Sequence, residues 1–405
     1  MNSVIRLSRN LKIVRKMVGF FLALFCLVEP ALADWNARNS IELSPQHRKL
    51  NQNGFTREND VSDVFALATS HLEWSEGNWF AEIKPEVRAV MSNGILAAVP
   101  AAVSAQTSRR ALNSRRTLAN DSGHPGSEAS IDLDRFNVRR SFEFGDVYLG
   151  RKPLSLGVLR FFPVWNKLTL PLIFQPGPEW IENPDVVGGT TQIGGMTYRI
   201  FASRAGEPSV DDLALMTARM VDEGFEVQFL VGSWWLRSVA GVAVAFDFQA
   251  ATLRLESLWV SQYSQEAAQG QIGLGFERAL DEKWTLVAEA LYQTAGLEDV
   301  AGSLAPPSRF MNLGGRYYFL PHLSYQVHPL WQIKAGVLTA FGQNQSAIAM
   351  GGFEHSMSDN TTLTLKMKLP FGAEKGEFGP ERVTAPMGRK LGMSSTVLLQ
   401  LQSTF

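Results

Sequence analysis

The chain has 405 residues, with 38 Lys and Arg against 39 Asp and Glu and a formal net charge of -1 at pH 7. A chain this close to neutral lacks the basic stripe that nucleic-acid binding needs, so we expect no nucleic-acid partner. The single cysteine, Cys26, excludes a disulfide framework, and the six histidines are scattered without metal-ligand spacing, which predicts no metal or other cofactor.

The first 33 residues have the pattern of a secretory signal peptide. Five basic residues precede residue 17, an apolar run extends from Met17 to Val28, and the small-x-small site Ala31-Leu-Ala33 follows. That run is too short for a membrane helix, which needs ~20 residues, although a single-span anchor is the alternative. Cleavage after Ala33 would leave 33 basic and 38 acidic residues, a net charge of about -5. Residues 34–60 are expected to form a periplasmic N-terminal segment that precedes a barrel over 61–405.

Beyond the signal, short stretches alternate between apolar and polar residues, and no apolar run reaches ~18 residues. In residues 79–89, one face is apolar and the other carries Glu82, Lys84, Glu86 and Arg88. The same alternation recurs in 271–277, 284–293, 331–337 and 362–369. Pro85 cannot donate its ladder hydrogen bond, so we expect a bulge or an unpaired position there.

A soluble sandwich and an outer-membrane barrel share this alternation, but three features favour the barrel. Trp79, Trp284 and Trp331 stand at strand ends, as in an interfacial girdle. Charges are absent from the apolar faces, where Lys or Arg at mid-membrane would cost roughly 2–4 kcal/mol. Tight turns also alternate with long loops, as expected for periplasmic turns and extracellular loops. The tight turns are 75–78, 143–146, 281–283 and 358–360, and the long loops are 93–130, 157–190, 296–315 and 372–390.

The fold class predicted is therefore all-β, a closed antiparallel transmembrane β-barrel. Sixteen segments between residues 61 and 405 fit the strand pattern. The up-down assignment is ambiguous between 191 and 236, and 210–219 has a helix-like composition. We therefore predict about 14 strands, with 12 or 16 as the alternatives.

The final segment, 391–405, places Val397, Leu399, Leu401 and Phe405 on one face and polar residues on the other. It resembles the terminal strand of bacterial outer-membrane barrels, although Ser403 stands where those proteins usually carry an aromatic residue. The resemblance implies that Phe405 is an assembly signal and that the barrel-assembly machinery is a partner.

Two further passages resemble porin-like outer-membrane proteins of largely uncharacterised function. Residues 144–157, FGDVYLGRKPLSLG, with Trp165-Asn166 are similar to a strand and loop of these proteins, and 322–360 resembles their C-terminal strands. Lys152, Leu156 and Lys167 replace the usual Gln, Trp and Pro. The resemblance covers 130–403 loosely. It implies a Gram-negative outer-membrane barrel, serving as a channel, and it transfers no catalytic residue. Because no Ser-His or Asp-His motif is recognisable, we expect no enzyme.

If the apolar faces point to lipid, twelve charged side chains face the lumen. These are Glu82, Lys84, Glu86, Arg88, Arg199, Arg254, Glu256, Glu277, Glu289, Lys334, Lys366 and Lys368. Seven bases against five acids make a nearly balanced wall, which predicts a weakly selective aqueous pore. The alternative is that these charges pair across the lumen and satisfy one another.

Loop 157–190 holds five aromatic residues and five prolines, more apolar surface than a solvated loop normally exposes. We predict an inward-folded constriction that presents Arg160 and Lys167 to the pathway; an external contact surface or a cap on the rim are the alternatives. Loop 93–130 repeats Ser-Arg-Arg-x-Leu, whose arginines suit lipopolysaccharide phosphates or simply solvent.

The function predicted is passive diffusion or export of small hydrophilic solutes through a mixed-charge lumen. The alternative is a closed structural or adhesive barrel that acts through its extracellular loops. Outer-membrane lipid and lipopolysaccharide are the expected surroundings in either case.

Overall fold

The structure, a computed structural model, describes residues 35–49, 60–92, 116–120, 128–165, 183–203, 213–264, 266–299, 313–378, 383–385, 389–391 and 395–404. In these ranges the named elements are all β-strands. No helix in the described ranges is long and apolar enough to cross a membrane. The predicted signal peptide, Lys167, Phe405 and most of loop 93–130 lie outside the described residues.

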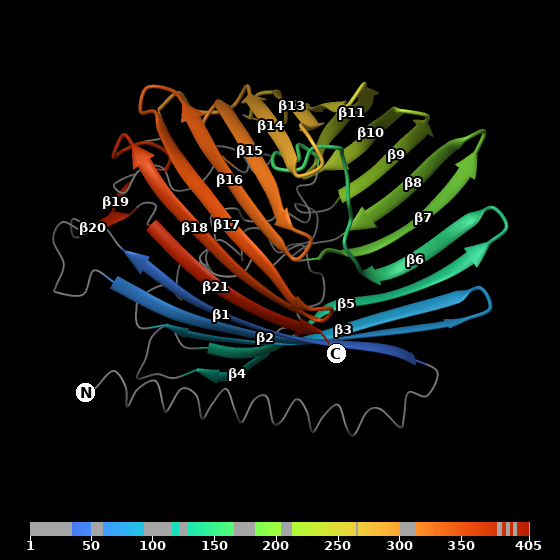
Figure 1. The fold of residues 1–405 in the computed structure, drawn as a ribbon. Coiled ribbons are helices and arrows are strands. Elements are labelled where there is room, and N and C mark those ends of the chain that lie inside the picture. The colour runs from blue at the N-terminus through green and yellow to red at the C-terminus, as the bar shows by residue number, and fades with distance from the viewer. Residues whose placement is uncertain are drawn as a thin grey trace.

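Eighteen strands of the described chain form one closed antiparallel barrel (Figure 1). They are β1 (Trp35–Lys49), β2 (Asp60–Glu76), β3 (Trp79–Ser92), β5 (Glu128–Phe142), β6 (Gly145–Arg151), β7 (Asp185–Ile193), β8 (Met196–Ser203), β9 (Leu213–Asp222), β10 (Phe225–Trp234), β11 (Arg237–Phe248), β12 (Ala251–Val260), β13 (Gln269–Ala279), β14 (Trp284–Gln293), β15 (Tyr317–His328), β16 (Trp331–Phe341), β17 (Ser346–Ser358), β18 (Thr361–Gly372) and β21 (Ser395–Thr404). Of the other three, β4 (Arg116–Asn120) pairs with β5, and β19 (Val383–Ala385) pairs with β20 (Arg389–Leu391).

The closed antiparallel barrel is confirmed, but the predicted strand number is wrong, because neither 14 nor 12 or 16 matches the eighteen strands. Each of the sixteen candidate segments coincides with a strand, and the two that sequence reasoning missed are β1 and β7. The apolar face of strand β1 is interrupted by Asn39 and His47, and β7 has two consecutive glycines, Gly188 and Gly189, so neither shows a regular alternation.

Strand β1 closes the barrel. It pairs with β2 along its whole length and with β21 on its other side, where Leu43 faces Leu401. Residues 35–49 are therefore a barrel strand, which corrects their assignment to a periplasmic segment that ends at residue 60. Without β1, the edges of β2 and β21 would both be left with unpaired backbone groups, which a lipid environment does not tolerate.

Short turns join the strands at one end of the barrel, for example at 77–78, 143–144 and 359–360, and most connections at the other end are longer, apart from the two-residue turn 235–236. In outer-membrane barrels the short turns are periplasmic. The expected irregularity at Pro85 is confirmed, since the register of β3 against β5 shifts between Lys84 and Pro85.

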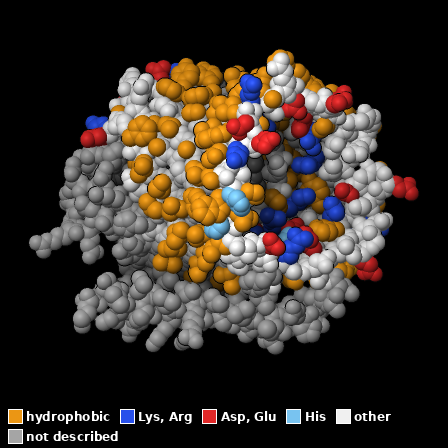
Figure 2. Space-filling view, viewed as in Figure 1, with side chains coloured by type: hydrophobic (Ala, Val, Ile, Leu, Met, Phe, Trp, Pro, Cys, Tyr) orange, Lys and Arg blue, Asp and Glu red, His pale blue; other side chains and the backbone are white. Residues whose placement is uncertain are grey.

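The outer wall is apolar. Leu149, Ile200 and Leu274 are more than half exposed on their strands, while the alternate positions are buried or polar. Figure 2 shows hydrophobic side chains gathered over the outer surface, with Lys and Arg side chains gathered in the hollow. The predicted aromatic positions near the short turns are also confirmed, because Trp79 and Trp331 are exposed there and Trp284 stacks on Tyr325 at 4.2 Å.

A second apolar cluster lies on the inside of the barrel, against the inner faces of β8–β17. Its members come from most of those strands, from β6 and β7, from the segment that follows β6, and from Leu313 and Phe378. They include Leu154, Leu156, Leu159, Phe162, Val164, Trp165, Phe201, Leu215, Leu230, Trp234, Leu258, Leu291, Tyr318, Leu320, Leu338 and Phe378. Side chains therefore fill part of the lumen.

Candidate functional site

Residues 152–165, here called the inner segment, follow β6 and turn into the barrel. Val164 and Trp165 are 0 % exposed, and Phe162 is buried beside them. Trp165 Nε1 donates a 2.6 Å hydrogen bond to the carbonyl oxygen of Ser257 on β12. Residues 157–165 of the predicted loop are therefore folded inward, as predicted, rather than displayed on the outside or capping the rim, whereas 185–190 belong to strand β7.

The carboxylate of Glu256, on the inner face of β12, binds backbone amides of the inner segment on both sides of residues 160–164. It accepts hydrogen bonds from the backbone amides of Val158 at 2.8 Å, Leu159 at 3.2 Å and Trp165 at 2.5 Å. Glu256 is 0 % exposed. A residue predicted to line an aqueous lumen is thus engaged with the backbone of the inner segment.

Glu289, two strands away on β14, binds the middle of the same segment. Its carboxylate accepts from the amides of Arg160 at 2.7 Å, Phe161 at 2.8 Å and Phe162 at 2.8 Å. Glu289 is also 0 % exposed. Hydrogen bonds to an ionised acceptor are about twice as strong as neutral ones, so six such bonds hold these amides firmly.

The barrel wall is shaped to receive the segment. A Cβ atom placed on Gly241 of β11 would lie 2.5 Å from Trp165 Nε1, and one placed on Gly275 of β13 would lie 2.9 Å from a methyl carbon of Leu159. On Gly273 it would overlap the other Leu159 methyl carbon. These glycines stand at inner-facing positions, so each leaves a pit that one side chain of the inner segment fills.

A second segment, 373–378, also turns inward. The Glu377 carboxylate accepts from the backbone amides of 314–315 at 2.7 and 3.0 Å, and from the hydroxyl of Tyr318. Phe378 is 0 % exposed and lies 6.5 Å from the Tyr318 ring, whose other neighbour is Phe162 at 6.2 Å. Sequence reasoning recognised 372–390 only as a long loop and missed that both inward segments pack on Tyr318.

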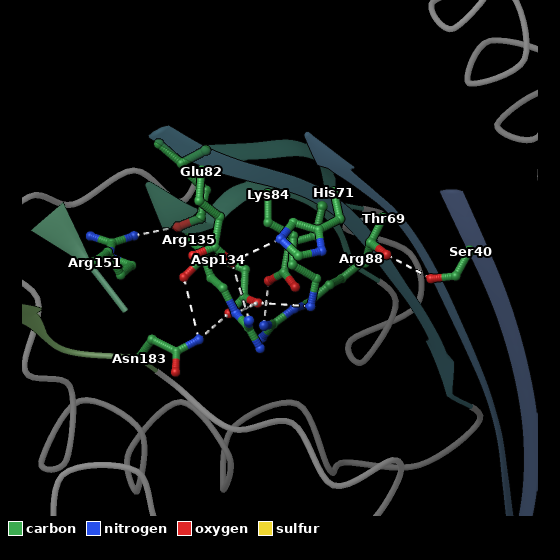
Figure 3. Close-up of polar contacts among 12 residues, drawn as sticks. Ser40, Thr69, His71, Glu82, Lys84, Arg88, Asp134, Arg135, Arg151 and Asn183 are labelled. Carbon is green, nitrogen blue, oxygen red and sulfur yellow. Dashed lines mark hydrogen bonds and ion pairs between the residues drawn. The ribbon is translucent and has the colours of Figure 1, made fainter. Parts of the chain in front are cut away.

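The opposite inner wall, on β2, β3 and β5, is a network of paired charges (Figure 3). Glu82 accepts from His71 at 2.8 Å and from Arg135 at 3.2 Å, and Lys84 binds Asp134 at 3.0 Å. Glu82 and Lys84 therefore bind side chains of the neighbouring strands β2 and β5, rather than other predicted residues across the lumen.

The network continues along the same wall. Glu86 pairs with Arg88. At the end of β6, Arg151 is fully buried and donates to Asp185 at 2.7 Å and to the carbonyl oxygen of Leu133 at 2.6 Å. A buried guanidinium of this kind is stable only because its donors are satisfied. The sequence carried no signal for Arg151, whose partner lies 34 residues away.

The remaining predicted residues are distributed around the barrel. Glu277 accepts from Arg254 at 2.6 Å and from the predicted constriction residue Arg160 at 2.8 Å. Lys334 pairs with Glu354 at 3.0 Å. The other two lysines lie on β18, where Lys366 and Lys368 face Leu398 and Thr396 of β21 in the register.

A cavity of about 640 Å³, here called the vestibule, lies between the inner segment and the inner faces of β8–β12. It is lined by Asp222, Gly224 and Phe225 at a short turn, which places it toward the periplasmic end. Its basic side chains are Arg199, Arg219 and Arg254. Arg219 is held by Glu226 through two hydrogen bonds of 2.7 and 3.0 Å.

Arg199 belongs to a group of bases that sequence reasoning found only in part. Lys152 Nζ lies 4.0 Å from the centre of the Tyr148 ring, and the charges of Arg199 and Arg139 act on Lys152 together with those of Glu82 and Asp146. We call Arg139, Lys152 and Arg199 the basic cluster. Like charges gathered beside a polar cavity attract anions. Among the described residues, no three potential metal ligands converge.

Three solved structures illustrate the likeness of this barrel to known proteins. Pseudomonas aeruginosa OccK5 (OpdH) aligns with a TM-score of 0.57 at 7 % identity, covering 91 % of this chain and 98 % of that chain. A BenF-like porin from Pseudomonas fluorescens Pf-5 gives 0.59 at 8 %, with 92 % and 98 % covered. Pseudomonas aeruginosa OccK2 (OpdF), solved in complex with glucuronate, gives 0.56 at 9 %, with 92 % and 98 % covered.

No family model matches the sequence, and no curated protein matches it. The likeness is therefore one of fold, a closed antiparallel barrel like those of the three solved structures.

Proposed function

We propose that this protein is an outer-membrane channel through which small hydrophilic solutes pass passively, with the inner segment as its constriction. The observation that carries the proposal is the inner segment itself, fixed inside a closed barrel by six amide–carboxylate hydrogen bonds. A purely structural barrel has no need of a loop seated so specifically in its lumen. The porin fold of the similar structures supports the same function.

Small organic anions are the solutes we propose. The basic cluster stands near the vestibule, which contains Arg199. Arg guanidinium groups bind carboxylates in a bidentate manner, which suits solutes such as sugar acids. The glucuronate bound in the OccK2 structure supports this class of solute.

The test is electrical and uses the full chain without residues 1–33, refolded in detergent and inserted into planar lipid bilayers. We expect discrete conductance steps, and in a salt gradient a reversal potential that indicates a preference for anions. In a matched swelling assay, liposomes containing the protein are expected to admit glucuronate faster than a neutral sugar of similar size. A folded barrel that gives no steps would overturn the channel, and a cation preference would overturn the anionic solute.

One observation favours a second candidate, the closed barrel with a structural or adhesive role. The apolar cluster fills part of the lumen, and Phe378 reaches it from the second inward segment. A closed barrel would show heat-modifiable migration on a gel, which marks a folded barrel, together with an absence of conductance. Cell fractionation tests the outer-membrane location that both candidates share, and lipopolysaccharide and the barrel-assembly machinery remain the partners we propose.

A further inference from the structure

We propose that Glu256 and Glu289 are positioning residues that latch the inner segment and thereby set the aperture of the channel, an inference that rests on the proposed function. Sequence reasoning placed both among the residues that line the pathway. In the structure their oxygens bind backbone amides and are fully buried. Their contribution to permeation is therefore to hold the constriction in place.

The chemistry of the latch follows from the backbone of the inner segment. Residues 158–165 are not part of a strand ladder, so their amide donors must find other acceptors when they are buried. Two carboxylates supply acceptors for six of these donors, at 2.5–3.2 Å. Because both carboxylates are 0 % exposed, water does not compete for the same amides.

The two carboxylates divide the segment between them. Glu256 on β12 holds residues 158, 159 and 165, and Glu289 on β14 holds 160–162. Between them, Gly273 and Gly275 of β13 receive the Leu159 side chain. The segment is therefore clamped across three adjacent strands, and losing one carboxylate leaves it attached through the other.

The latch also determines where a charged side chain lies. The Arg160 amide is bound by Glu289, while its guanidinium is half exposed and contacts Glu277 at 2.8 Å. Glu277 is in turn held by Arg254, which belongs to the vestibule. Freeing residues 160–162 would therefore displace a guanidinium that lies beside the vestibule.

The experiment uses Glu289→Gln, Glu256→Gln and the double variant, each as the full chain without residues 1–33. The amide group of Gln removes the charge and turns an NH₂ donor toward backbone donors. With three charge-assisted bonds weakened, we expect hydrogen exchange at 160–162 to become about tenfold faster or more in Glu289→Gln. The double variant is expected to show larger and noisier single-channel conductance, roughly twofold above wild type, because a released segment no longer occupies a fixed part of the lumen.

The matched control is Glu354→Gln. It removes the same charge from the inner face, but Glu354 binds Lys334 on β16 instead of the inner segment. We expect its exchange over 157–165 to equal that of wild type. An equal rise in conductance in the control would show that charge alone is responsible, and unchanged exchange in the latch variants would show that the carboxylates do not hold the segment. Either result overturns the proposal.

The failure of the proposed function is distinguishable from the failure of the latch. If the folded wild-type barrel shows no conductance, the proposed channel function is overturned, and the double variant then tests the latch. If conductance steps appear in the double variant together with faster hydrogen exchange, the latch is supported. If the double variant also shows no conductance, the latch is overturned. If the double variant does not fold, as judged by heat-modifiable migration, Glu289→Gln decides alone, because Glu256 still holds both ends of its segment.

Discussion

Gly157 is the position where a single methyl group should release the inner segment. Its backbone has a φ of +82°, a conformation that favours glycine. A Cβ atom at this position would lie 2.5 Å from Oε1 of Glu256 and closer still to the other two carboxylate atoms. The substitution Gly157→Ala therefore strains the turn and pushes the carboxylate away from the amides that it binds.

The magnitude can be worked from these contacts. A non-glycine residue in the left-handed region costs about 1–2 kcal/mol. Displacing Glu256 also weakens its bonds to the neighbouring amides of Val158 and Leu159, each worth about 1.5–3 kcal/mol with a charged acceptor. Allowing for partial recovery through hydration, we expect the local free energy of opening to fall by about 3 kcal/mol, or roughly a hundredfold in exchange rate. The barrel strands do not depend on this turn, so the global stability should change less.

Hydrogen exchange measured by mass spectrometry on the refolded barrel checks this, with peptides that cover 152–165 compared against peptides from β13 and β18. Gly270→Ala is the control, since the nearest atom to its added Cβ is a Thr294 methyl carbon at an ordinary 3.5 Å. Exchange over 157–165 that matches wild type in Gly157→Ala would refute the view that the carboxylate and the turn are geometrically interlocked.

Three more predictions concern selectivity, lipid exposure and closure. Arg199→Ala should lower the preference for anions several-fold, seen as a shift of the reversal potential toward zero, because the basic cluster loses the member that lines the vestibule. Leu274→Arg should lower the free energy of unfolding by about 2–4 kcal/mol in urea titrations, whereas Thr364→Arg on the inner face should change it by less than about 1 kcal/mol. Deleting 35–49 should abolish heat-modifiable migration, while deleting 383–391, whose strands β19 and β20 pair with each other and with no barrel strand in the described part of the chain, should preserve it.

Each of these has an outcome that contradicts it. An unchanged reversal potential would remove Arg199 from the selectivity of the channel. Equal losses of stability for the two arginine substitutions would contradict the assignment of the outer face to lipid. A folded barrel without 35–49 would mean that β2 and β21 can close directly on one another.

Most of the fold was readable from the sequence because lipid and lumen impose opposite chemistry on alternate residues. The segment 362–369 shows this, since its leucines and Met367 face outward while its threonines and lysines face inward. Alternation did not identify β1 as a strand, because its outward residues include Asn39 and Pro45 as well as Ile41 and Leu43, which makes the two faces differ less clearly. A strand that is hydrogen-bonded to a neighbouring strand on each side keeps its place in the barrel without a strictly apolar outer face.

The site was readable only in part. The inward phase of Glu256 and Glu289 followed from alternation, but their partners did not, because the bonds join residues 91 to 129 positions apart. One signal was available: Gly273 and Gly275 occupy inner-facing positions where a polar side chain is usual, which indicates a wall that something approaches closely. Periodicity indicates which face of a strand a side chain occupies, but it does not identify the groups that the side chain contacts.

The count of seven bases against five acids consequently misstates the electrostatics of the lumen. Two of the five acids, Glu256 and Glu289, bind backbone amides, and a third, Glu277, binds both Arg160 and Arg254. Glu256 and Glu289 cannot contact a passing cation directly, because their oxygens are buried and bonded to backbone amides. The basic cluster lies near a polar cavity, with Glu82 and Asp146 also acting on Lys152. The anion preference proposed above is consistent with a constriction that holds two of the five acids away from the solute.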